Sequence, residues 1–397
     1  MKKDNFKSRR VTLMRATGIV GTIALAGALT ACGSSGSAGN GSNSSSSGGG
    51  SNVIKIGEIG ALSGDLASLG TWDSQGLQMV VDEVNAKGGI HGKKVQIIKL
   101  DDQGSPSVAV DDAKKLINEG IVAAIATPES TTTLATLSVF AQAQVPQITA
   151  GEDPRLTEQG SKFVFRDDAS SGVFNQTLVN YVVKTMGLKK IAVITNTDSF
   201  GQGNHTTFLA DLKALGITPV ADEVVSPTAK DFSAQLTSIK AANPQVLFIG
   251  TEEVEMGLIA KQARALGLKS QFIAGQGADT NIYLNTAGAS VANGTIFDTT
   301  YVSNDATPES KAFAAAYKAK FGQVADSHVA KGYDGAEMLM QAINNAYPNV
   351  DGPHIAAALH KLSYQGLTGD FKYNDNGEGL FKTTMGTIKG GKPVPLN

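Results

Sequence analysis

The regular alternation of short β-branched runs with longer amphipathic stretches constrains the fold more than any other feature of this sequence. This pattern predicts strands at residues 53–60, 94–100, 121–126 and 147–149. It predicts helices between them at residues 71–86, 107–118 and 131–143. Strands that alternate with helices in this way form parallel sheets whose crossover connections are the helices. The sequence therefore predicts an α/β fold.

The same alternation begins again after residue 190. It predicts strands at residues 190–195, 219–225, 246–250 and 271–274, with helices at 202–215, 232–242 and 254–266. Residues 53–397 are too many for one average domain and about right for two. We therefore predict two doubly wound parallel-sheet units. Each has its ligand-binding crevice at the carboxyl ends of its strands.

The pattern loosens after the second unit. Helices are predicted at 308–321, 330–346 and 354–362, a strand at 369–373, a turn at 374–377 and a last strand at 383–389. A chain that visits a second lobe and then returns to complete the first explains this tail. Two contiguous lobes are the alternative.

The N-terminus predicts an export signal at residues 1–31. Six basic residues precede an uncharged stretch from Ala16 to Ala31, which is shorter than a membrane-spanning helix requires. Leu29-Thr30-Ala31-Cys32 resembles the lipobox of bacterial lipoproteins, which predicts lipidation of Cys32, the only cysteine in the chain. Ordinary cleavage near Ala31 and a twin-arginine route through Arg9-Arg10 are the alternatives. Residues 32–52, rich in Gly and Ser, form a flexible tether.

Composition and motifs exclude several classes of function. Removal of the signal leaves 28 basic against 35 acidic side chains, a charge of −7 that does not suggest nucleic-acid binding. No later segment has an uninterrupted apolar run of membrane-spanning length, so the lipid is the only expected membrane attachment. The five histidines show no metal-ligand spacing, and residues 88–94 lack the Gly-Lys-Ser/Thr of a phosphate loop. We expect no cofactor, no metal and no enzymatic activity.

Several short segments, in their order and spacing, carry a resemblance to a known family. They are residues 54–57 (IKIG), 62–64 (LSG), 81–94 (VDEVNAKGGIHGKK), 101–102 (DD), 232–236 (FSAQL), 239–244 (IKAANP), 261–269 (KQARALGLK) and 332–334 (GYD). Across nearly all of residues 53–397, the chain resembles the Leu/Ile/Val-binding family, the type I periplasmic binding proteins that serve branched-chain amino-acid transporters. The resemblance implies a non-enzymatic receptor that binds its ligand between two lobes.

The resemblance also implies a set of ligand contacts. By position, Ser130 matches a serine that binds the ligand carboxylate at a helix start, and a hydroxyl beside unpaired helix N–H groups suits an anion. An N-cap role is the plain alternative. The loop Gly151-Glu152-Asp153 matches a second contact, with Asp153 in place of a threonine. Phe200 matches an aromatic residue that packs on the ligand, and a lobe-core role is its alternative.

Three positions depart from the family pattern. Leu69 replaces an aromatic residue, Glu252 stands where an aromatic contact is expected, and Gln276 stands where an acid binds the ligand ammonium. The ligand therefore need not be a branched-chain amino acid. Our hypothesis is that Asp153 has taken over cation binding from the neutral Gln276.

The resemblance implies a three-segment hinge, with crossings near Ser170, Thr300 and Leu367. We therefore expect lobe 1 at residues 53–170 and 300–366, and lobe 2 at 171–299 and 367–397. The expected function is that of an extracytoplasmic solute-binding lipoprotein that delivers a small polar ligand to the permease of an ABC transporter. The ligand is an amino acid, an amide or an amine. A sensory receptor of the same fold is the alternative.

Overall fold

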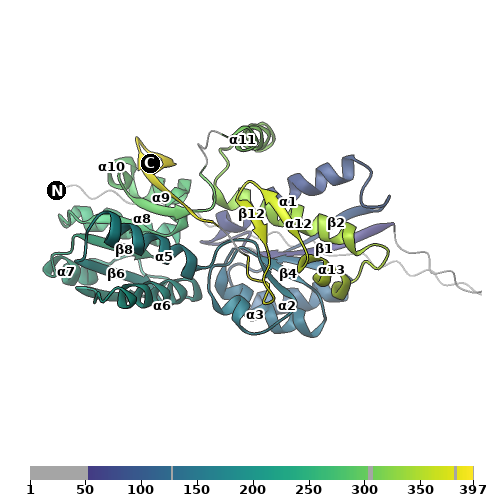
Figure 1. The fold of residues 1–397 in the computed structure, drawn as a ribbon, viewed down its shortest axis with the longest axis horizontal. Coiled ribbons are helices and arrows are strands. Elements are labelled where there is room, and N and C mark those ends of the chain that lie inside the picture. Colours follow the sequence, from purple (N-terminus) through teal and green to yellow (C-terminus); the bar gives the residue numbers. More distant parts are fainter. Residues whose placement is uncertain (1–51, 127, 303–306, 380–381, 397) are drawn as a thin grey trace, which may run out of the picture. The chain divides into compact units, whose positions relative to one another are not determined.

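A computed structural model describes residues 52–126, 128–302, 307–379 and 382–396 (Figure 1). The predicted signal, Cys32 and all of the tether except Asn52 lie outside the described residues. Within the described residues, no helix is both long and apolar enough to cross a membrane.

The first sheet consists of five parallel strands in the order β2-β1-β3-β4-β5. The strands are β1 (Val53–Gly60), β2 (Lys94–Asp101), β3 (Ala123–Ala126), β4 (Gln147–Thr149) and β5 (Val164–Arg166). Their connections carry α1 (Ala67–Ala86), α2 (Pro106–Asn118), α3 (Ser130–Gln142) and α4 (Arg155–Glu158). This strand order is one of the common doubly wound arrangements, with its switch point between β1 and β3.

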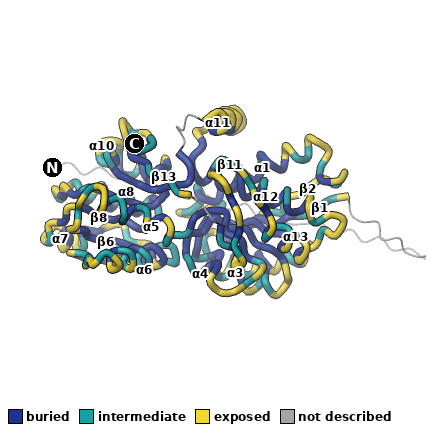
Figure 2. Tube along the Cα trace, viewed as in Figure 1, coloured by how far each residue is buried: buried dark blue, intermediate teal, exposed yellow. Residues whose placement is uncertain are grey.

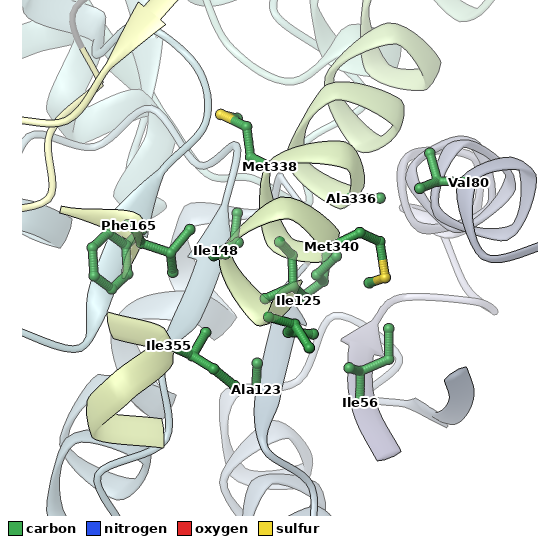
Figure 3. Packing of buried hydrophobic residues seen from close by; sticks show 14 of the residues in the cluster. Ile56, Val80, Ala123, Ile125, Ile148, Phe165, Ala336, Met338, Met340 and Ile355 are labelled. Carbon is green, nitrogen blue, oxygen red and sulfur yellow. The ribbon is translucent and has the colours of Figure 1, made fainter. Parts of the chain in front are cut away.

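Two helices from much later in the chain complete the core of this sheet. They are α12 (Ser327–Ala346) and α13 (Gly352–Leu359). Figure 3 shows Met340 of α12 near Ile125 of the sheet, Ala336 beside Val80 of α1, and Ile355 of α13 near Ala123. Full burial of each large aliphatic side chain contributes about 1.5–3 kcal/mol, so these late helices are integral to the first lobe.

The second sheet has seven strands in the order β14-β13-β10-β9-β8-β6-β7. The strands are β6 (Ile191–Asn196), β7 (Ala221–Val225), β8 (Val246–Gly250), β9 (Gln271–Ala274), β10 (Ile296–Thr299), β13 (Thr384–Lys389) and β14 (Lys392–Pro395). Strands β6 to β10 are parallel, and β13 and β14 add antiparallel pairs. Figure 2 shows buried strands inside partly exposed helices, as a doubly wound sheet requires.

Helices precede and connect the parallel strands of the second sheet. They are α5 (Ser171–Asn180), a π-helical turn (Tyr181–Thr185), α6 (Ser199–Ala214), α7 (Ser233–Ala241), α8 (Glu253–Ala265), the 3₁₀ turn η2 (Gln276–Asp279), α9 (Asn281–Ala287) and α10 (Ala289–Ala292). Helix α11 (Pro308–Phe321) follows β10. The predicted fold class, two doubly wound parallel-sheet lobes, is confirmed.

The chain returns to the second sheet later than residue 367. A hairpin of β11 (Ser363–Gly366) and β12 (Gly369–Lys372) follows α13, and Phe371 and Tyr373 belong to the core of the first sheet. Tyr373 packs against Phe165 with ring centroids 5.0 Å apart. Strand β13 of the second sheet begins only at Thr384. The expected crossing near Leu367 therefore comes too early, because the hairpin still packs on the first sheet.

Candidate functional site

Every residue predicted to contact the ligand follows the carboxyl end of a parallel strand. Ser130 begins α3 after β3, and Glu152 lies in the loop after β4. In the second sheet, Phe200 follows β6, Glu252 follows β8 and Gln276 follows β9. This edge is where doubly wound sheets bind their ligands.

A small cavity of about 20 Å³ brings four of the predicted residues together. Leu69, Glu152, Phe200 and Glu252 line it, although they come from the connections of both sheets. Its other lining residues are Pro128, Glu253, Gly277, His328 and Lys331. A cavity of this size holds about one water molecule.

A larger cleft of about 400 Å³ shares Leu69, Glu252 and Glu253 with the small cavity. We call it the acidic cleft, because six of its sixteen lining residues are Asp or Glu and one is Lys. Ser199, at the start of α6, donates its backbone N–H to Thr131 Oγ1 of α3 at 3.2 Å. Residues of both sheets therefore meet at this cleft.

Ser130 and the loop after β4 hold each other in place. Fully buried Ser130 Oγ accepts hydrogen bonds from the backbone N–H groups of Glu152 and Asp153, each at 3.2 Å. The carbonyl oxygen of Gly151 accepts a short hydrogen bond from Arg166. Ser130 and Gly151 line neither cavity. In this structure they shape the loop that places Glu152.

Asp153 is occupied by an arginine of its own loop. Its Oδ1 accepts from the backbone N–H of Arg155 at 2.9 Å, and both its oxygens lie 3.0 Å from Arg155 Nε. The carboxylate is buried and lines neither cavity. Our hypothesis placed this charge opposite the ligand cation, whereas the structure places it opposite Arg155.

Gln276 is bonded to a buried lysine that the sequence reasoning overlooked. Lys331 Nζ donates to Gln276 Oε1 at 2.6 Å and lies 2.9 Å from Asp168 Oδ2. Both charged side chains are buried, and Asp168 also accepts from Thr300 Oγ1 at 3.1 Å. The ammonium of Lys331 therefore lies directly beside the side-chain oxygen of Gln276.

His328, one turn before Lys331 on α12, forms a second polar contact at the small cavity. Its Nε2 lies 2.9 Å from Glu253 Oε1, and its ring stacks on Trp72 at 5.8 Å. Its Nδ1 is buried without a hydrogen-bond partner among the described residues. A spacing of three puts His328 and Lys331 on the same face of α12. Because α12 carries further polar residues such as Asp334, Glu337 and Gln341, this pair did not stand out in the sequence.

Burial and neighbouring negative charge raise the pKa of the carboxyl groups around these cavities. Burial raises the pKa of Glu152 to about 8, although the positive charge of Lys331 opposes the shift. Burial and the charge of Asp198 hold the pKa of Glu252 well above its usual range. A positive charge placed near these carboxyl groups would lower their pKa and favour their ionised form.

The described residues contain no cluster of three or more His, Cys, Asp or Glu side chains placed to hold a metal ion. The two cavities are lined by carboxyl groups and apolar side chains. Hydrogen bonds hold several of these lining residues in place, as a ligand-binding site requires.

Comparison with known proteins gives consistent results. A family model described as periplasmic binding protein matches residues 53–392. A Leu/Ile/Val-binding protein (BraC3) from Rhizobium johnstonii is 33% identical over 348 residues, covering 84% of this chain and 93% of the relative.

Two solved structures share the fold. A leucine-binding protein (LivK) from Thermotoga maritima is 27% identical with a TM-score of 0.80, covering 87% of this chain and 98% of the other. A branched-chain amino-acid transporter substrate-binding protein (LivJ) from Streptococcus pneumoniae, in complex with isoleucine, is 26% identical with a TM-score of 0.79, covering 87% and 100%.

Proposed function

The chain belongs to the periplasmic binding protein family, and from this premise we propose that it is the extracytoplasmic solute-binding lipoprotein of an ABC transporter. It captures an amino acid or a related small polar solute between two lobes and delivers it to the permease. The relatives described above are binding proteins and not enzymes.

One observation carries the proposal. The connections at the carboxyl ends of two separate sheets converge on a single cavity, to which the first lobe contributes Leu69 and Glu152 and the second Phe200 and Glu252. A ligand that contacts both sides favours the conformation in which the lobes approach each other. The permease would recognise that conformation.

The division into lobes is part of the proposal. The first lobe comprises residues 53–170 and 300–366, extended by the hairpin and Tyr373, and the second lobe the remainder of the described chain. Three segments cross between them, near Ser170, near Thr300 and between Tyr373 and β13. The buried contact of Thr300 with Asp168 fixes two of these segments to each other.

A thermal-shift screen of the purified protein against amino acids, amides and amines tests the binding function. A ligand present at about 100 times its dissociation constant adds roughly 2.7 kcal/mol of stability and moves the unfolding midpoint by a few degrees. A protein whose midpoint responds to none of these compounds would contradict the proposed function.

Membrane attachment is tested separately at Cys32. Replacement of Cys32 by Ser removes the thiol that takes the lipid, so Cys32→Ser is expected in the soluble fraction of cells with unchanged ligand affinity. A Cys32→Ser protein that stays with the membranes rules out the proposed anchor and leaves the binding function untouched.

A further inference from the structure

The acidic cleft carries information about the charge of its ligand. Its acidic lining residues are Asp65, Glu129, Asp198, Glu252, Glu253 and Glu255. Its one basic lining residue, Lys230, lies 3.6 Å from Asp65, and both side chains are exposed. The lining therefore presents five carboxyl groups without a paired lysine or arginine of the cleft.

Neutral donors of the chain already hold three of these carboxyl groups in place. Asn196 Nδ2 donates to Asp198 Oδ2 at 2.7 Å and to Glu255 Oε2 at 2.6 Å, and Thr132 Oγ1 donates to Glu129 Oε2 at 2.7 Å. These bonds orient the carboxyl groups without cancelling their charge.

Glu255 adds an independent sign that a partner is missing. Its side chain is 3% exposed and lines the cleft, yet its Oε1 has no hydrogen-bond partner among the described residues. A buried carboxylate oxygen without a donor is unfavourable, because it has lost its hydrogen bonds to water and gained none in return. A ligand that donates N–H groups would satisfy it.

The carboxyl groups of the cleft raise one another's pKa, which also favours a cationic ligand. Burial and the negative charge of Asp102 and Asp198 raise the pKa of Glu129 to about 7, and burial with Asp198 raises that of Glu255 to about 7. Burial followed by the charges of Asp198, Glu253, Glu129 and Glu255 raises the pKa of Glu252. A cation bound among these carboxyl groups offsets their mutual repulsion and lowers their pKa.

The rest of the cleft suits an aliphatic ligand body. Leu66, Leu69, Pro227, Val254 and Ile282 form its apolar wall, and its volume of about 400 Å³ lies within the usual range for small-molecule sites. The first turn of α8, which begins at Glu253, contains no lysine or arginine.

We propose that the ligand of this protein is a small organic cation, with an ammonium or guanidinium group held among Glu129, Glu252 and Glu255 and an aliphatic chain against Leu69 and Ile282. The inference rests on the proposed function, because it assigns a ligand class to the same site. It departs from the neutral amino acid that the isoleucine-bound relative carries.

Three closely related aliphatic compounds test the ligand class. Lysine is norleucine with a terminal ammonium, and cadaverine is lysine without its carboxylate. Thermal shift and calorimetry on the full chain are expected to show binding of cadaverine or lysine and at least tenfold weaker binding of norleucine. Agmatine is added to the series to test a guanidinium group, and calcium chloride is added to test an inorganic cation.

Two variants locate the effect. Glu255→Gln removes a charge while keeping shape, so it is expected to weaken binding of the cation at least tenfold. Glu309→Gln, on the exposed face of α11, is the matched control and is expected to leave it unchanged. The affinity is expected to rise between about pH 6 and pH 8, because Glu129 and Glu255, whose pKa values are raised to about 7, lose protons there. Asp198, Glu252, Glu253 and Lys230 of the cleft face them.

The outcomes separate the two proposals. Stabilisation by leucine or norleucine but by none of the organic cations overturns the cation assignment and leaves the binding function standing. A response to calcium alone also overturns it, as does Glu255→Gln binding the cation as tightly as the control. A chain that responds to no compound of any class contradicts the binding function as well.

Discussion

At the scale of single residues, four of the nine residues that line the small cavity were among the expected ligand contacts, and the charges that organise the cavity were missed. The four are Leu69, Glu152, Phe200 and Glu252. Lys331 was not singled out, because a lysine in a helix is usually exposed. Its burial depends on Asp168, 163 residues earlier, and on Gln276. Pairings of this range are invisible in a local pattern.

The side-chain partner of Asp153 could not be predicted from the sequence either. Position placed its carboxylate at the ligand, whereas Arg155, two residues later, pairs with it in the structure. Whether a charge faces a ligand or a neighbour depends on the rotamers of both side chains, and the sequence does not encode these in any local signal.

We predict that Lys331→Met lowers the free energy of unfolding by about 3–5 kcal/mol, because it leaves the buried Asp168 carboxylate without its cation. Urea denaturation followed by circular dichroism measures the change. Lys318→Met, on the exposed face of α11, is the control and is expected within about 0.5 kcal/mol of the parent. A Lys331→Met protein as stable as this control would show that the buried pair contributes nothing to stability.

We predict a pH-dependent stability that Glu152→Gln weakens. The pKa of Glu152 is raised to about 8 in the folded state, so folding takes up a proton and stability falls as the pH rises from about 4.5 to about 8. Glutamine mimics the protonated form throughout. The Glu152→Gln protein is expected to melt at the parent temperature near pH 4.5 and several degrees higher near pH 8.

Thermal melts at a series of pH values measure this difference, and Glu158→Gln on the exposed side of α4 is the control. Parallel curves for Glu152→Gln and the parent protein would mean that Glu152 titrates normally.

At the scale of elements, most strands of both sheets were predicted, whereas β5, β10 and the helix α5 were missed. The strands at residues 53–60 and 246–250 are confirmed to the residue. Strand β5 has only three residues, and β10 carries the buried polar side chains of Asp298 and Thr299, so neither shows a periodic pattern. Packing against neighbouring strands, which no local window contains, decides such segments.

A turn of the tail fixes the edge of the first sheet. Gly377 has a φ of +77°, and its carbonyl oxygen accepts from the backbone N–H of Arg166 in β5 at 2.8 Å. A Cβ atom at this position would lie 1.9 Å from the carbonyl oxygen of Val164. Only glycine allows the tail to lie so close to the strand.

We predict that Gly377→Ala lowers the free energy of unfolding by about 2–4 kcal/mol, from left-handed strain and the backbone clash together. Gly216→Ala separates the two effects, since Gly216 has a φ of +70° and nothing within 4 Å of the added Cβ. That control is expected to lose only about 1 kcal/mol. Equal losses in urea denaturation would show that the close approach to Val164 carries no cost.

At the scale of the whole molecule, the two-lobed α/β class followed from the alternation of strands and helices, which is a property of the entire chain. The point at which the tail leaves the first lobe did not follow, because β11 and β12 are short and only their packing beside Tyr373 assigns them. The charge of the acidic cleft did not follow either, because it is a sum over loops far apart in sequence.

We predict that saturation with the ligand found in the screen makes the protein more compact, because contacts with both lobes favour their approach. Small-angle X-ray scattering of the free and saturated protein measures the radius of gyration. An unchanged radius at saturation, verified by calorimetry on the same sample, would contradict lobe closure.

The pairing of β10 with β13 delays completion of the second sheet during translation. Strand β10 ends at Thr299 and its antiparallel neighbour begins at Thr384, so 84 residues must be translated between them. At about 5–20 residues per second, the ribosome needs roughly 4–17 s to deliver the second partner. Throughout that interval one edge of β10 stays open. The second sheet is therefore incomplete until β13 has been made, which leaves that time for chaperones or export factors to engage the chain.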